Sequence, residues 1–114
     1  MSRENPGLAM TTLGALAEPN RMRIVELLRD GPLTVGEIAD RLGLRQPQAS
    51  KHLKVLSDNG ILIVKAEGNR RIYQLKPDPF QALDSWVKSF RRLTEDRMDN
   101  LDAYLIEVQS REHP

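Results

Sequence analysis

The stretch that decides the fold is RQPQASKHLKVLSDNG, residues Arg45 to Gly60. On a helix of about residues 46–59, Ala49, Leu53 and Leu56 recur at spacings of four and three, so they form a narrow apolar stripe. A proline in the first turn is tolerated because the N–H groups there have no partner within the helix, and the closing glycine is typical of a helix end. The stretch therefore predicts an amphipathic helix.

The polar face of this helix consists of side chains that can all donate hydrogen bonds. A glutamine can pair bidentately with adenine, and a lysine can reach guanine or a phosphate, so such a face suits DNA. The same pattern also fits a solvated surface helix, and the neighbouring segments must decide between the two interpretations. The polar residues are Gln46, Gln48, Ser50, Lys51 and Lys54.

The segment just before it predicts a second short helix. Thr34-Val35-Gly36-Glu37 fits the S/T-x-x-E capping box, in which the first and last residues bond to each other's backbone. Ile38, Ala39 and Leu42 supply the apolar face, and Gly43 ends the helix. Two short helices joined by a tight turn, the second with a polar face, predict a helix-turn-helix whose second helix reads DNA.

Two further helices are expected upstream, after a flexible polar tail of residues 1–7. The first runs from Leu8 to before Pro19. Asn20 is expected to cap the second, which stops at Asp30-Gly31-Pro32. Its apolar positions are expected to form a broad buried face, and they are Met22, Ile24, Val25, Leu27 and Leu28.

After Gly60 the pattern changes to strand. Ile61–Val64 and Ile72–Leu75 are β-prone, and Gly68-Asn69 between them is a favourable hairpin turn. A basic hairpin directly after a reader helix is a wing, here about residues 61–76. Its arginines would meet the sugar–phosphate backbone or a narrow minor groove. They are Arg70 and Arg71.

The last element is expected to be a long helix of about residues 79–110, since no Gly or Pro interrupts this region. Such a helix, ~45 Å long, exceeds what one small domain needs to cover its core. Its near-heptad apolar seam predicts pairing with the same helix of a second subunit. The alternatives are a helix folded back on its own domain or broken near Thr94.

Composition and charge bound the remaining possibilities. A chain of 114 residues forms one domain, residues 8–114 here, and the absence of Cys excludes disulfides and thiolate metal sites. No apolar run approaches ~18 residues and no signal peptide is visible, so we expect a cytoplasmic protein without a membrane partner. Residues 45–76 hold seven basic and two acidic residues (+5), and 77–114 five and eight (−3). This division fits a DNA-binding segment beside an assembly element, or a coincidence of short windows.

From about Leu13 to Leu105 the chain resembles the ArsR-type (arsenic-repressor-like) winged-helix transcriptional regulators. The matching segments are Leu16–Ile24, Leu33–Leu44, Gln46–Leu56 and Asn59–Leu62, with S-x-H-L-x-x-L at Ser50–Leu56 the most diagnostic. The resemblance implies a mainly α fold with a small β-hairpin, a winged helix-turn-helix with N-terminal and long C-terminal dimerisation helices. It also implies a homodimer that reads a palindromic operator in double-stranded DNA and usually represses its own operon. The expected interface residues are Leu13, Leu16, Phe80, Leu83, Val87, Phe90, Leu101, Tyr104 and Leu105.

The sequence departs from the metal-sensing members of that family. Where some members carry two cysteines on the helix before the reader helix, this chain has Thr34 and Gly36. Other members place Asp and His ligands on the final helix, but the only histidines here are His52 and His113. His52 belongs to the reader-helix motif, where a packing or helix-bonding role is expected, and His113 lies near the end. We therefore expect no metal site of either familiar kind and no cofactor. Arg45 stands where a hydroxyl cap is commoner, and could instead reach a phosphate.

These patterns together predict a DNA-binding transcriptional repressor with no assigned effector. The expected base-reading residues are Gln46, Gln48, Ser50 and Lys51, and the backbone or minor-groove residues are Arg45, Lys54, Arg70 and Arg71. A winged-helix protein–protein adaptor is the alternative. An enzyme is disfavoured because Ser50 and His52 point about 200° apart on a helix and no phosphate loop is present. Trp86 and Phe90 could line a site for an apolar ligand, or simply form dimer core.

Overall fold

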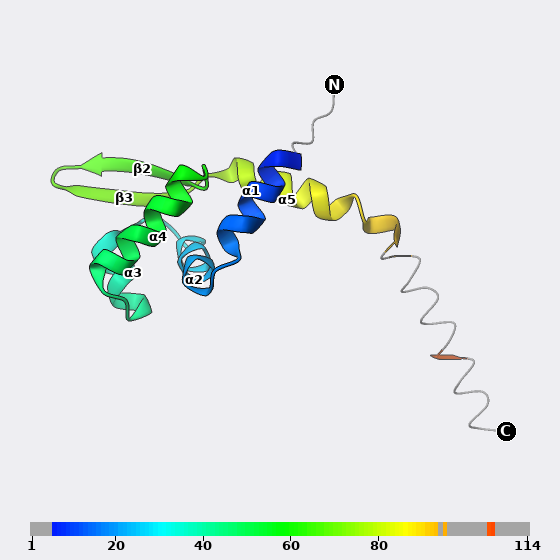
Figure 1. The fold of residues 1–114 in the computed structure, drawn as a ribbon, viewed down its shortest axis with the longest axis horizontal. Helices are drawn as coiled ribbons and strands as arrows, with labels where there is room; N and C mark the ends of the chain where they lie inside the picture. The colour runs from blue at the N-terminus through cyan, green and yellow to red at the C-terminus, as the bar shows by residue number, and fades with distance from the viewer. Residues whose placement is uncertain (1–5, 94, 96–104, 107–114) are drawn as a thin grey trace.

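The computed structural model describes residues 6–93, 95 and 105–106. Helices α2, α3 and α4 pack together, the β2–β3 hairpin extends to one side, and α1 and α5 pack against each other on the other (Figure 1). This mainly helical architecture with one small hairpin confirms the predicted winged fold class. In chain order the elements are α1 (Pro6–Leu16), α2 (Pro19–Leu28), β1 (Leu33–Thr34), α3 (Val35–Leu42), α4 (Gln46–Asp58), β2 (Leu62–Glu67), β3 (Arg70–Leu75) and α5 (Pro77–Lys88).

The predicted wing is an antiparallel hairpin. Strands β2 and β3 pair from Leu62 opposite Leu75 to Glu67 opposite Arg70, and Gly68 adopts a positive φ of 62° in the two-residue turn. A third strand, β1, pairs with the other side of β3, giving the order β1-β3-β2. The sequence did not predict β1, because two residues are too few to show a strand periodicity. This strand ties the start of α3 to the wing.

The apolar stripe of α4 is the centre of the core, as predicted. Ala49, Leu53 and Leu56 are at most 1% exposed, and they cluster with Ile24 of α2 and Ile38 of α3. Burying a leucine or isoleucine side chain completely stabilises a fold by roughly 1.5–3 kcal/mol. The opposite face of α4 is thereby held outward and available for binding.

The ends of α3 fix the helix-turn-helix. The hydroxyl of Thr34 accepts a hydrogen bond from the backbone N–H of Glu37, and the Glu37 carboxylate accepts one from the N–H of Thr34, which confirms the capping box. These bonds from the Thr34 backbone and hydroxyl hold the pKa of Glu37 below its usual value. At the other end, Gly43 has a φ of 66°, a left-handed conformation that costs glycine little.

Two expectations about α2 were wrong. Its cap is Glu18 rather than Asn20, since Glu18 Oε2 accepts a hydrogen bond from the N–H of Arg21 at 2.8 Å. The physical reason is Pro19 in the first helical position, which keeps the preceding residue extended, as a cap must be. Met22 is also 47% exposed and lies outside the buried face, which Ile24, Val25 and Leu28 form.

The single uninterrupted helix expected for residues 79–110 is not confirmed. Helix α5 begins at Pro77 and ends at Lys88, a turn follows at Ser89 and Phe90, and residues 91–93 are helical again. The hydroxyl of Ser89 donates to the carbonyl of Trp86, a local bond that competes with helix continuation. Leu101 and Tyr104, two of the expected interface residues, lie outside the described residues.

Candidate nucleic-acid interface

The eight side chains expected to contact DNA are all exposed. Six belong to α4 or its N-terminal cap, and two belong to the first residues of β3. None of them belongs to the buried stripe of α4, so a ligand could contact them without disturbing the core. They are Arg45, Gln46, Gln48, Ser50, Lys51, Lys54, Arg70 and Arg71.

An open cleft of about 800 Å³ lies between α4 and the wing, and five of these eight residues line it. Thr34 and Gly36, at the start of α3, line it as well. Its charged groups are Lys54, Arg70 and Arg71 against Asp58, so the cleft has an excess of positive charge. The five shared residues are Gln46, Ser50, Lys54, Arg70 and Arg71.

The three remaining residues lie outside the cleft lining and have different surroundings. Gln48 Oε1 accepts a hydrogen bond from the backbone N–H of Arg45 at 3.1 Å, the reaching-back half of a capping box. Arg45 cannot supply the other half, because a guanidinium has no acceptor atom. Lys51 is exposed on α4. The eight candidates therefore divide into five residues that line the cleft and three that lie outside it.

The side chain of Gln46 lies close to the start of α3. A Cβ placed on Gly36 would lie 3.8 Å from Gln46 Nε2, an ordinary van der Waals distance. The amide nitrogen of Gln46 thus lies near the first turn of α3, and both Gln46 and Gly36 line the cleft. Gln46 and Gln48 occupy different surroundings although they are two residues apart.

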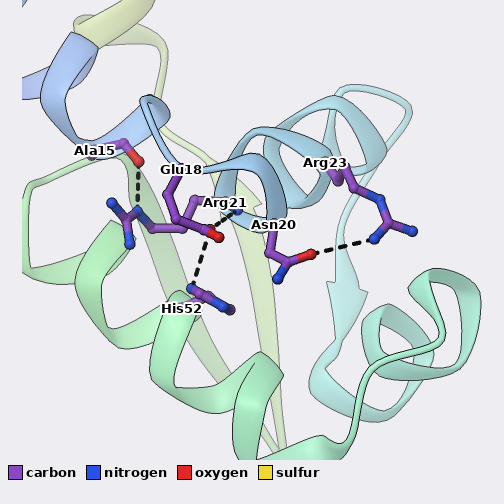
Figure 2. Close-up of polar contacts among 6 residues, drawn as sticks. All are labelled: Ala15, Glu18, Asn20, Arg21, Arg23 and His52. Carbon is purple, nitrogen blue, oxygen red and sulfur yellow. Dashed lines mark hydrogen bonds and ion pairs between the residues drawn. The ribbon is translucent and has the colours of Figure 1, made fainter.

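His52 joins the reader helix to α2, as Figure 2 shows. Its Nδ1 lies 3.6 Å from Oε2 of Glu18, and Arg21 Nε donates to the carbonyl of Ala15 at 2.6 Å beside it. The N–H of Arg21 is the main cause that lowers the pKa of Glu18, and the charge of His52 contributes. The predicted packing role of His52 fits this placement, whereas Glu18 was missed because its only sequence signal is the proline after it.

The residues expected at the dimer interface fall into two groups, one packed within its own chain and one exposed. Leu16 and Phe80 pack against the core of their own chain, and Leu83 is half-buried. Leu13 on α1 and Val87 on α5 are 42% and 59% exposed. The rings of Trp86 and Phe90, also exposed, meet edge to face at 5.2 Å. Leu105 is exposed as well. A surface of large apolar side chains therefore covers parts of α1 and α5.

Three further observations concern metal ligands and membrane-spanning helices. Within the part of the chain that the structure describes, no three His, Asp or Glu side chains group as metal ligands. Thr34, at one of the positions of the metal-sensing cysteines, is engaged in the capping box. None of the described helices combines the length and apolar character needed to cross a membrane.

Known proteins are similar to this chain in sequence and in fold. A helix-turn-helix domain model matches residues 16–65. The HTH-type transcriptional regulator Rv2034 of Mycobacterium tuberculosis is 46% identical over 76 residues, which are 67% of this chain and 71% of that protein.

Solved structures agree. A crystal structure of an ArsR family transcriptional regulator superposes with a TM-score of 0.70 at 29% identity, covering 82% of this chain and 97% of the other. A homodimeric winged helix-turn-helix DNA-binding domain from Mycobacterium bovis, solved by NMR, gives a TM-score of 0.61 at 26% identity, covering 79% and 92%. With the reader helix, the wing and the connecting turn all in place, this chain belongs to the ArsR family of winged helix-turn-helix transcriptional regulators.

Proposed function

We propose that this DNA-binding regulator is a homodimeric repressor that recognises a palindromic operator, including one in its own operon. The observation that carries the proposal is the cleft, in which polar residues of α4 and both wing arginines face a common space. Lys54, Arg70 and Arg71 give that space the charge that a phosphate backbone requires.

In this proposal α4 enters the major groove and the wing lies over the adjacent backbone or minor groove. Contacts to phosphates set the register of the protein, and contacts to base edges choose the sequence. The arginines of the wing, Arg70 and Arg71, belong to the first kind. The exposed end of α4, from Gln46 to Lys51, holds the side chains that can make the second kind.

The proposed partner of the apolar surface on α1 and α5 is a second copy of the chain. Leu13, Val87 and Phe90 expose large apolar groups there, which a lone domain in water would leave unfavourably hydrated. A two-fold pairing presents two reader helices related by symmetry, so the operator should contain inverted half-sites about 34–36 Å apart, or a multiple of one helical turn. The homodimer found in the Mycobacterium bovis relative supports this proposal.

We further propose that operator binding needs no metal or cofactor. The chain has no Cys and only two histidines, and one of these, His52, is paired with Glu18. Adding Zn²⁺, Ni²⁺ or a chelator should then leave the affinity for DNA unchanged. A several-fold change with any of them would contradict this part.

The function is tested by selection of bound duplexes from a random pool, followed by sequencing. We expect enrichment of one inverted repeat, which is also found upstream of the gene of this protein. A pool that stays random after several rounds would contradict sequence-specific binding, and enrichment of a single unrepeated half-site would contradict the dimer.

A further inference from the structure

The reader helix presents two polar faces rather than one. Gln46, Ser50 and Lys54 are spaced by four residues, so they lie on one side of α4, and all three line the cleft beside the wing. Gln48 lies roughly 200° around the helix from Gln46, and Lys51 roughly 140°. Neither lines the cleft. The helix therefore carries two glutamines, one on each face.

The cleft face is placed to hold a strand rather than to read bases. A helix in the major groove and a wing in the neighbouring minor groove have one sugar–phosphate backbone between them. The space between α4 and the wing is the cleft, with Arg70 and Arg71 on its far wall. Gln46 lines this cleft with its amide nitrogen near Gly36, so a strand bound in the cleft would lie within its reach.

The outer face begins with a glutamine, Gln48, whose oxygen already accepts one hydrogen bond from the backbone of its own helix. Gln48 Oε1 accepts from the N–H of Arg45 at 3.1 Å, which leaves its two amide N–H donors directed away from the helix backbone. Guanine presents two acceptors, O6 and N7, in the major groove. Adenine presents one acceptor and one donor, so bidentate pairing with it would require the Gln48 oxygen to share or give up its bond to the Arg45 N–H, whereas guanine needs only the amide donors.

We infer that Gln48 is the specificity-determining glutamine and reads guanine through its amide NH₂ group, whereas Gln46 binds the sugar–phosphate backbone in the cleft. This inference rests on the proposed operator reading and assigns the base. It departs from the sequence-based expectation that both glutamines read base edges and that a glutamine here would pair with adenine.

The test uses the full chain and three variants: Gln46→Ala, Gln48→Ala and Gln48→Glu. Each is titrated against the selected operator and against every single-base substitution of one half-site. We expect wild type to favour guanine at one position by about 5- to 150-fold. Gln48→Ala should abolish the base preference at that position alone. Gln46→Ala should weaken binding to all duplexes by a similar factor.

Gln48→Glu is the sharper variant, because it keeps an oxygen for the Arg45 N–H and replaces the donors with a second acceptor. The preference at the same position should move to cytosine, whose N4 amino group donates in the major groove. Circular dichroism of each variant establishes that the helices are retained.

Three outcomes would overturn the inference. Adenine preferred at the position that Gln48→Ala flattens would show bidentate pairing. Loss of a base preference at any position in Gln46→Ala would show that Gln46 contacts a base. Unchanged preferences in both Gln48 variants, with wild type still selective, would remove Gln48 from recognition. Equal binding of wild type to all duplexes is a different result, because it contradicts the proposed function itself.

Discussion

Nδ1 of His52, in the middle of the reader helix, lies 3.6 Å from Oε2 of Glu18 at the start of α2 (Figure 2). The same carboxylate accepts a hydrogen bond from the backbone N–H of Arg21 and so caps the N-terminus of α2. The Glu18 side chain thus caps the N-terminus of α2 and also contacts the middle of α4, so it links the two helices.

This relationship predicts a pH-dependent contribution to stability. The pKa of Glu18 is lowered in the fold, mainly by the Arg21 N–H, so its ionised form stabilises the folded state. The contribution is complete above the ordinary glutamate value of about 4.3 and disappears as the pH falls through the lower folded value.

Glu18→Gln isolates this charge, because glutamine keeps an acceptor for the Arg21 N–H. Urea unfolding at a series of pH values should show the variant less stable than wild type at pH 7 and the two converging below about pH 4. A difference that persists undiminished at pH 3 would mean that the charge of Glu18 is not the cause.

Thr34→Ala should lower the free energy of unfolding by about 0.5–2 kcal/mol, because it removes the hydroxyl that caps α3. Thr11→Ala is a matched control, since that exposed hydroxyl bonds to the carbonyl of Gly7 within the same helix, α1. We expect the control to change stability by less than about 0.5 kcal/mol. Equal losses in both variants would argue against the capping box as a determinant of the helix-turn-helix.

Arg70→Ala should weaken binding to operator and random duplexes by the same factor and reduce the slope of log affinity against log salt by about one phosphate contact. Arg29→Ala is the control: it removes an equal charge from an exposed site at the end of α2 that does not line the cleft. An unchanged salt slope in Arg70→Ala would show that Arg70 does not contact a phosphate.

Val87→Asp should convert the proposed dimer into monomers, because it puts a charge into the apolar surface of α1 and α5. Gln81→Asp, on the polar side of the same helix, should leave the dimer intact. Sedimentation velocity distinguishes the two states. A Val87→Asp protein that remains dimeric would locate the interface elsewhere.

Local signals made much of the fold predictable from the sequence. The spacing of Ala49, Leu53 and Leu56 defined the buried side of α4. The Thr34–Glu37 capping box and Gly43 defined both ends of α3, and Gly68-Asn69 defined the wing turn. Each of these features depends on residues within one or two turns of the chain, which is why sequence periodicity and capping residues reveal them.

Features that depend on tertiary contacts were not predictable. The pairing of β1 with β3 joins residues 33–34 to 72–73, and two residues carry no periodicity. The contact of Glu18 with His52 joins two helices and has no local signal. The division of the DNA-contacting candidates also required the position of the wing, because only the cleft distinguishes Gln46 from Gln48.

The most direct test of the central claim is a titration of the purified protein against a duplex from its own promoter and a scrambled duplex at ~150 mM salt. The proposed dimeric operator reader should prefer the promoter duplex by about 10³-fold or more, with two subunits bound per site. Equal and weak binding to both duplexes would contradict the proposal and favour an adaptor that binds a protein partner.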